Sequence, residues 1–497
     1  MVAGFVVSAT LLWTLQCSLL QSVLSIDIYE TIVWGSQMQW GHSKHPPLSG
    51  WIGYFFSWVT GHSDWGMYFV AQLCLGLGVW FTYRLARLFF DRYRAAVAAL
   101  LLYLLIFYTP SETKFSTYFV EIAIAPLAAY TLLRALREGA LLRWIAFGAL
   151  CALGILNKYS FGLMLTAFAL IVLTRREYRR ALATPGPYLA FLVFLLMISP
   201  HLKWLYEHHF VCFRHTVERL EAAHSMLMPL MVAGMVVYPL ATELLALALV
   251  YIPFRYRIVK PAGDDGRRAR LAACCREFFT GFPRSAADRE ALHFAAILTL
   301  FPGTFYLAAS LCGTDIILMW LCTVFSASGI MLLALVPVVI DRAFFRRFAI
   351  LLMIYIAVVF VVMTLDSLFR TAVSMHIDPT DVVCKAEAYW RRHSAEPVPV
   401  VVGGFRFAAL FSHYSAGHPP VCEVEDEIML ELYRDTIRRH GALLIDNSED
   451  VFDEFFRRIG RKKVKFLHDR TQCRALLGEE RRPRFIVGYL APEDGGR

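Results

Sequence analysis

Long apolar runs separated by short polar loops fill the first 366 residues. The runs approach the roughly 17 to 25 residues that a helix needs to cross a bilayer. We count eleven of them, at 2–23, 66–83, 95–109, 117–133, 144–156, 160–174, 186–202, 226–253, 291–311, 316–340 and 348–366. The first run lacks a basic start and a small-residue cleavage site, so we expect a retained helix, not a signal peptide. The pattern predicts a polytopic α-helical membrane protein.

Residues 367–497 follow a different pattern, which predicts a soluble α/β domain after a membrane core of residues 1–366. Short β-branched or aliphatic runs at 398–402, 443–446 and 485–489 predict strands. Amphipathic spacing at 380–393, 404–416, 427–440 and 449–460 predicts helices between them. Gly403-Gly404-Phe405 follows the first strand. Two glycines are more typical of a helix start than of a phosphate-binding loop.

Composition and charge support a membrane class. The chain is 58% hydrophobic and only 18% charged, whereas about a quarter of a soluble protein is charged. The net charge of +9 comes from arginines gathered in alternate loops, which is a topology signal and not a nucleic-acid footprint. Because positive loops mark the cytoplasm, we expect the N-terminus inside and, after eleven spans, the tail outside.

The stretch 25–51 carries ionisable groups between two apolar runs, and such groups are functional candidates. Asp27 could accept or orient the proton of an attacking hydroxyl; the alternative is a solvated carboxylate at a helix end. Lys44 and His45 precede Pro46-Pro47, which stiffens the turn. Paired cationic donors suit a phosphate, and a basic anchor at the membrane surface is the alternative.

Further cations lie in the other loops that we place outside. Each, taken alone, is typical of an interface anchor. Four lysines that each adjoin an aromatic ring would together form a cationic pocket for an anionic lipid head group. These lysines are Lys44, Lys114, Lys158 and Lys203, with His201 beside the last. We find no zinc-ligand spacing and no Walker A or DxD motif, so no cofactor is predicted.

Several of these residues form motifs that resemble those of one protein family. Asp27, followed by Trp34, Gly41 and His45-Pro46-Pro47-Leu48, resembles the first external loop of the GT-C membrane glycosyltransferases. The relevant branch contains the dolichyl-phosphate-mannose protein mannosyltransferases and the bacterial lipid A aminoarabinose and galacturonic acid transferases. The resemblance continues, in order, through Lys114-Phe115, Asn157-Lys158-Tyr159-Ser160, Pro200-His201-Leu202-Lys203-Trp204 and Met319-Trp320.

The resemblance implies transfer of a sugar from a polyprenyl-phosphate carrier, outside the membrane, with inversion at the anomeric carbon. It makes Asp27 the catalytic carboxylate and a set of polar residues the substrate contacts. That set is Glu30, Lys44, His45, Lys114, Lys158, His201 and Lys203. The resemblance leaves open whether a divalent metal ion takes part.

The chain departs from the family pattern at three positions. Ile28 replaces the second carboxylate of the usual acidic pair. Lys44 stands where many members have an acid, and Glu30 stands where aminoarabinose transferases have a basic residue. The motifs Lys114-Phe115 and Pro-His-Leu-x-Trp favour the galacturonic acid transferase branch.

The resemblance, together with the charge pattern of the loops, therefore implies a glycosyltransferase of the bacterial inner membrane, with its active site and tail in the periplasm. The acceptor would be lipid A, lipopolysaccharide or another envelope glycan. Protein O-mannosyltransferase-like activity is an alternative. A flippase for a lipid-linked sugar would show internal repeats and broken helices near the midplane, and we find no repeat. An assembly protein that acts through its tail would not need eleven spans.

Overall fold

The computed structural model describes residues 1–109, 114–214, 226–258, 274, 285–336, 340–369, 377–471 and 483–493. They form two compact units. The first contains residues 1–11, 72–112 and 117–360, and the second contains 12–71, 113–116 and 361–497. Residues 12–71 thus group with the C-terminal tail.

Long apolar helices confirm the predicted polytopic α-helical class. Among the described residues, seven helices are long and apolar enough to cross a membrane, or eight if the bent pair at 159–183 is one span. The seven are α1 (Val2–Leu20), α4 (Asp64–Ala86), α6 (Thr117–Glu138), α10 (Pro185–Glu207), α12 (Met228–Ile258), α14 (Ala286–Leu311) and α16 (Arg342–Phe369).

Other predicted spans have a different form from a single long helix. The 144–156 run is the shorter apolar helix α7 (Leu141–Asn157). The 160–174 run is η3 (Tyr159–Phe161) with α8 (Gly162–Thr174), and the chain then bends by 98° into α9 (Arg176–Arg179) and η4 (Arg180–Ala183).

Two further runs are divided into short pieces. The 95–109 run comprises α5 (Arg92–Leu100), η1 (Leu101–Leu104) and η2 (Ile106–Tyr108), and the 316–340 run comprises η5 (Leu318–Leu321) and α15 (Ser328–Leu335). In the second case the hydroxyls of Ser326 and Ser328 donate to the carbonyls of Thr323 and Phe325. Such local bonds compete with a continuous helix.

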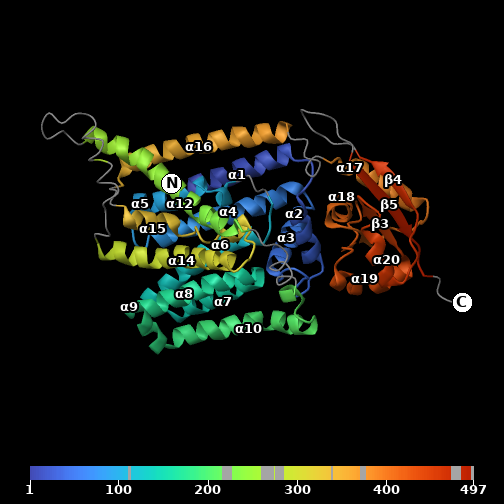
Figure 1. The fold of residues 1–497 in the computed structure, drawn as a ribbon, viewed down its shortest axis with the longest axis horizontal. Helices are drawn as coiled ribbons and strands as arrows, with labels where there is room; N and C mark the ends of the chain where they lie inside the picture. Colours follow the sequence, from blue (N-terminus) through green and yellow to red (C-terminus); the bar gives the residue numbers. More distant parts are fainter. Residues whose placement is uncertain are drawn as a thin grey trace. The chain divides into compact units, whose positions relative to one another are not determined.

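Close backbone contacts hold the helices of the first unit together. Helix α7 packs against α6 and α10 (Figure 1). A Cβ on Gly148 of α7 would lie 2.1 Å from the carbonyl oxygen of Ala190 in α10, so only glycine permits this approach. Small residues commonly have this role between membrane helices.

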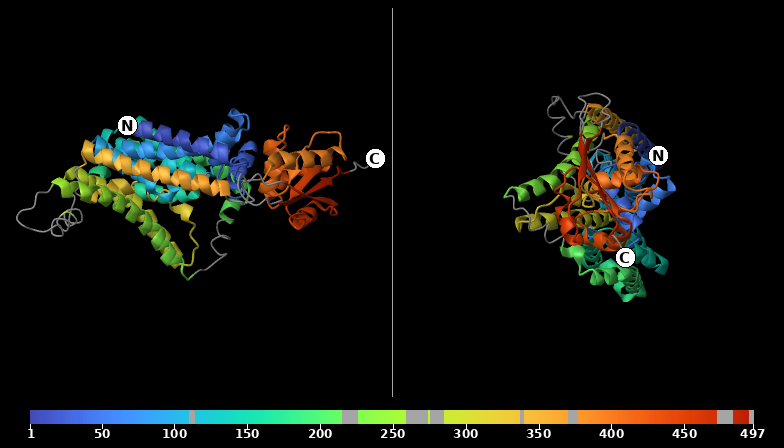
Figure 2. Two further views of the ribbon diagram at one scale, coloured as in Figure 1. Left: turned by 90° about the horizontal axis from the view of Figure 1, so that it is seen from above. Right: turned by 90° about the vertical axis from the view of Figure 1, so that its right-hand side faces the viewer.

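The second unit contains a five-stranded sheet in the order β2-β1-β3-β5-β4, drawn in orange and red in Figure 2. The strands are β1 (Val401–Val402), β2 (Val421–Cys422), β3 (Ala442–Asp446), β4 (Phe466–Arg470) and β5 (Arg484–Leu490). Strand β1 is parallel to β2 and β3, whereas β5 is antiparallel to β3 and β4.

The tail helices are α17 (Pro379–Arg391), η6 (Phe405–Ala409), α18 (Leu410–Tyr414), α19 (Glu427–His440) and α20 (Phe452–Ile459). The predicted small α/β fold of the tail is therefore confirmed, and its boundary at 366/367 stays a prediction. Strands β2 and β4 were not predicted: β2 has only two residues, and β4 is largely solvent-exposed.

Gly403 and Gly404 have structural roles at the start of a helix. A Cβ on Gly403 would lie 2.0 Å from the carbonyl oxygen of Ile445. The Gly404 amide donates to Asp446 Oδ2 at 2.5 Å. A protein carboxylate therefore takes the amide that a phosphate loop would offer, which favours the helix-start interpretation.

Helices α2 (Ile26–Ser36) and α3 (Leu48–Val59) form a tight hairpin in the second unit. A Cβ on Gly35 would lie 2.0 Å from the carbonyl oxygen of Gly50. Trp51 Nε1 donates to the Gln39 carbonyl at 3.2 Å, across the connecting loop. We call residues 37–47 the α2–α3 loop, and it carries Lys44 and His45.

Candidate functional site

The second unit brings three of the predicted residues together around Trp34. Lys44 Nζ lies 2.8 Å from Glu30 Oε1, and the two side chains are 37% and 18% exposed. The same ammonium lies 6.0 Å from the Trp34 ring centre. The His45 ring meets Trp34 edge-on at 5.7 Å, and the buried His42 ring stacks on Trp34 at 5.6 Å.

The Glu30–Lys44 contact explains two of the departures from the family pattern. Glu30 stands where a basic residue is expected, and Lys44 stands where an acid is expected. The two residues that depart from the family pattern therefore contact each other. Part-exposed pairs contribute only about 1 kcal/mol or less, so the pair matters more for the direction of the ammonium than for stability.

Residues of the tail complete the surroundings of Lys44. The Phe405 ring centre lies 5.5 Å from Lys44 Nζ, and Phe405 also meets Trp34 edge-on at 6.0 Å. Burial and the charges of Glu425 and Asp426 raise the pKa of Glu423 to about 7, and Lys44 opposes that rise. All these residues belong to the second unit.

Asp27 and Lys114 are exposed in this unit. Asp27 lies in the first turn of α2, where a carboxylate is favoured by the helix dipole. Lys114 precedes Phe115, whose buried ring lies against Gly53 of α3. The catalytic role of Asp27 and the substrate contact of Lys114 stay predictions.

The first unit brings three of the motif stretches together around Lys158. Lys158 follows α7 and is only 8% exposed. Its ammonium lies 3.9 Å from the Tyr118 ring centre and 5.9 Å from that of Trp320. Tyr159 Oη and His201 Nε2 share a hydrogen bond of 2.9 Å. The stretches 157–160, 200–204 and 319–320, far apart in sequence, therefore meet.

Lys203 differs from the other predicted contacts. Its side chain is 77% exposed and lies 3.7 Å from Glu207, one helical turn away. This is the geometry of a solvated surface pair, which matches the interface-anchor alternative.

Glu121 is a candidate that sequence reasoning missed. It is buried in α6, one turn after Tyr118, and it accepts a hydrogen bond of 3.3 Å from Ser160. A carboxylate inside an apolar run is a usable signal, so Glu121 could have been found. Phe405 and the acidic residues Glu423, Glu425 and Asp426 offered no such signal because they lie far along the chain from Lys44.

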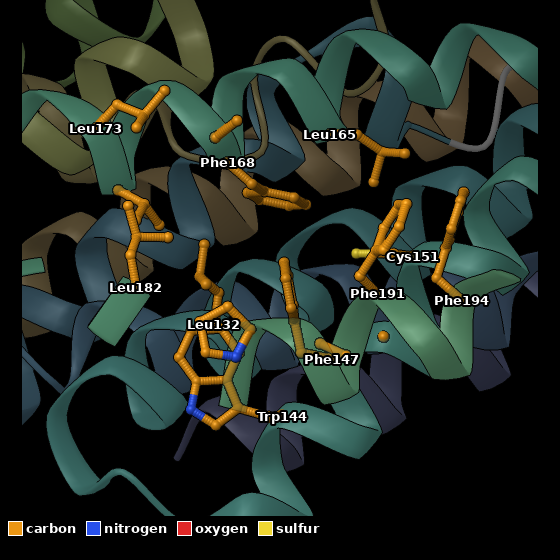
Figure 3. Close-up of a pocket in the computed structure, with 15 residues that line it drawn as sticks. Leu132, Trp144, Phe147, Cys151, Leu165, Phe168, Leu173, Leu182, Phe191 and Phe194 are labelled. Carbon is orange, nitrogen blue, oxygen red and sulfur yellow. The ribbon is translucent and has the colours of Figure 1, made fainter. Parts of the chain in front are cut away.

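The first unit also contains an apolar cavity of about 420 Å³ between α7, α8 and α10. Trp144, Phe147, Phe168, Phe191 and Phe194 contribute aromatic rings to its wall (Figure 3). Lys158 is the residue that follows α7, and His201 lies within α10. Within the described part of the chain, no group of three or more His, Cys, Asp or Glu side chains could hold a metal ion.

Comparisons with known proteins identify the fold. Residues 44–204 match the family described as dolichyl-phosphate-mannose-protein mannosyltransferase. No curated protein sequence matches the chain. The structure of ArnT from Cupriavidus metallidurans bound to undecaprenyl phosphate is similar, with a TM-score of 0.57 and 15% identity over 98% of this chain and 97% of that one.

The apo structure of the same ArnT has a TM-score of 0.57 and 14% identity over the same shares of both chains. An oligosaccharyltransferase from Archaeoglobus fulgidus matches at a TM-score of 0.41 and 11% identity, over 89% of this chain and 69% of that one. The ArnT comparison includes both the helical bundle and the tail. The chain therefore has the GT-C fold along nearly its whole length.

Proposed function

We propose that this protein is an inverting glycosyltransferase that takes a monosaccharide from a polyprenyl-phosphate carrier. The observation that carries the proposal is the fold shared over 98% of the chain with an ArnT structure that holds undecaprenyl phosphate. The motifs at Lys44-His45-Pro46-Pro47 and around Lys158 support it, because both present a cation beside aromatic rings. Such sites suit an anionic lipid head group.

The chemistry is a single displacement. The acceptor oxygen forms a bond to the anomeric carbon while the bond from that carbon to the carrier phosphate oxygen breaks. The bonding electrons leave with the phosphate. Asp27 takes or orients the acceptor proton. Lys44 and His45 stabilise the negative charge that grows on the phosphate, and Lys114 is a further contact to the phosphate or the sugar.

The apolar cavity supports a lipid-linked substrate. Its aromatic and aliphatic wall could hold part of a prenyl chain, which gains by leaving water. The acceptor is a lipid or glycan of the cell envelope. We place the reaction on the periplasmic face of a bacterial inner membrane because arginine-rich loops mark the opposite face.

A second candidate differs in the acceptor. The match of residues 44–204 to a protein mannosyltransferase family favours transfer to protein hydroxyls. A third candidate, a flippase for the same lipid-linked sugar, is favoured by the buried carboxyls of Glu121 and Glu243 inside α6 and α12, since such groups often mark transport pathways.

The test compares cells that carry the wild-type gene, Asp27→Asn or Glu427→Gln. Glu427 is a matched control because it is also a first-turn carboxylate and is 65% exposed. Mass spectrometry of lipid A, core oligosaccharide and envelope glycoproteins should show one sugar mass with wild type and Glu427→Gln. Cells that carry Asp27→Asn should lack that sugar mass at equal protein levels. An unchanged profile with Asp27→Asn would remove Asp27 as the catalyst and favour the flippase.

A further inference from the structure

A side-chain hydrogen bond connects the α2–α3 loop to the start of a tail helix. Ser43 Oγ donates to Asp426 Oδ2 at 2.6 Å, across 383 positions of sequence. The other oxygen of Asp426 accepts from the amides of Ile428 at 3.0 Å and Met429 at 3.1 Å, and so caps α19. Asp426 is 6% exposed. One buried carboxylate therefore joins the start of a tail helix to the residue before Lys44.

The position of Lys44 depends on a second tail residue. Its ammonium lies among Glu30, Trp34 and Phe405, of which only Phe405 belongs to the tail. Phe405 also contacts Trp34, which is buried. A lysine side chain has many rotamers, so a site that must present it in one direction needs walls on several sides. Phe405 forms one of them.

We propose that Ser43, Asp426 and Phe405 are positioning residues that aim Lys44 at the carrier phosphate. The tail then takes part in donor binding without touching the donor. The inference rests on the proposed function, because it needs Lys44 to contact a phosphate. The hydroxyl-to-carboxylate bond is charge-assisted and short, the stronger class of hydrogen bond.

These contacts could also serve the folding of the tail alone. The Ser43→Ala variant separates a role in folding from a role in positioning Lys44. This variant removes the loop contact but leaves both capping bonds of Asp426 in place. The matched control is Asp378→Ala. Asp378 caps α17 by accepting from the amides of Thr380 and Asp381, so its loss should weaken the tail in the same way without touching the α2–α3 loop.

The experiment uses the full-length protein in lipid nanodiscs, with undecaprenyl phosphate as the probe. Its Kd and the thermal midpoint are measured for wild type, Lys44→Ala, Ser43→Ala, Phe405→Leu and Asp378→Ala. We expect Ser43→Ala to raise Kd by about tenfold, the effect of losing one charge-assisted hydrogen bond. Phe405→Leu should raise Kd by about threefold, the size of one cation–π contact. Asp378→Ala should lower the thermal midpoint and leave Kd unchanged.

Three results would overturn the inference, and they differ in meaning. If Lys44→Ala weakens binding while Ser43→Ala and Phe405→Leu bind as wild type, Lys44 needs no help from the tail and the proposed function stands. If Lys44→Ala itself binds as wild type, the phosphate contact is wrong and the inference fails with it. A rise in Kd for Asp378→Ala equal to that of Ser43→Ala would reduce the effect to tail stability.

Discussion

Exchanging Glu30 and Lys44 tests whether the site needs a particular residue at each position or only an ion pair. Glu30→Lys alone places two ammonium groups where the structure has a contact of 2.8 Å. Lys44→Glu alone places two carboxylates there. The double variant restores one cation and one carboxylate in exchanged positions, which is the polarity that the family pattern leads us to expect.

The energies follow from the exposure of the pair. The side chains are 37% and 18% exposed, so solvent screens the attraction, and we expect a coupling of about 0.5–1 kcal/mol. Each single variant loses that attraction and gains a repulsion of similar size. Each should therefore lower stability by about 1–2 kcal/mol, and the loss should shrink in high salt.

The assay is a double-mutant cycle on thermal unfolding and on the affinity for undecaprenyl phosphate. Both single variants should unfold earlier and bind more weakly, and the double variant should recover most of the lost stability. A double variant that loses as much as the two single variants combined would refute the reasoning. A double variant that regains stability but not binding would show that the ammonium must come from position 44.

Two further predictions concern packing and pH. Gly35→Ala should destabilise the α2–α3 hairpin by about 1–3 kcal/mol, because its Cβ would lie 2.0 Å from the Gly50 carbonyl oxygen. Thermal unfolding measures the loss, and Gly417→Ala is the control, since a Cβ there meets nothing within 4 Å and its φ lies outside the left-handed region. The pKa of Glu423 is raised to about 7, so this group should lower stability as pH rises from about 4.5 through 7. Glu423→Gln should remove that loss and be more stable than wild type at pH 8, and an unchanged slope between pH 5 and 8 would contradict the assignment.

Much of the architecture is encoded in local pattern. Apolar runs of bilayer length specify helices wherever they occur, because an unpaired backbone group in lipid is costly. The tail helices could be predicted for a similar reason, since their apolar faces recur at helical spacing. The 316–340 run shows the limit: its hydropathy is that of a span, but the buried hydroxyls of Ser326 and Ser328 bind nearby carbonyls and the helix is short.

Identifying the candidate site required both the sequence and the tertiary structure. The sequence by itself determined which residues could carry charge at the ends of the spans: Asp27, Lys44, His45 and Lys158 stand out because ionisable groups are rare in apolar surroundings. Only the tertiary structure decided what each one meets. Glu30 pairs with Lys44, Ser43 binds Asp426, and Lys158 lies on Tyr118 and near Trp320. These partners are far apart in sequence, and residue spacing has no information on contacts that exist only once the chain has packed.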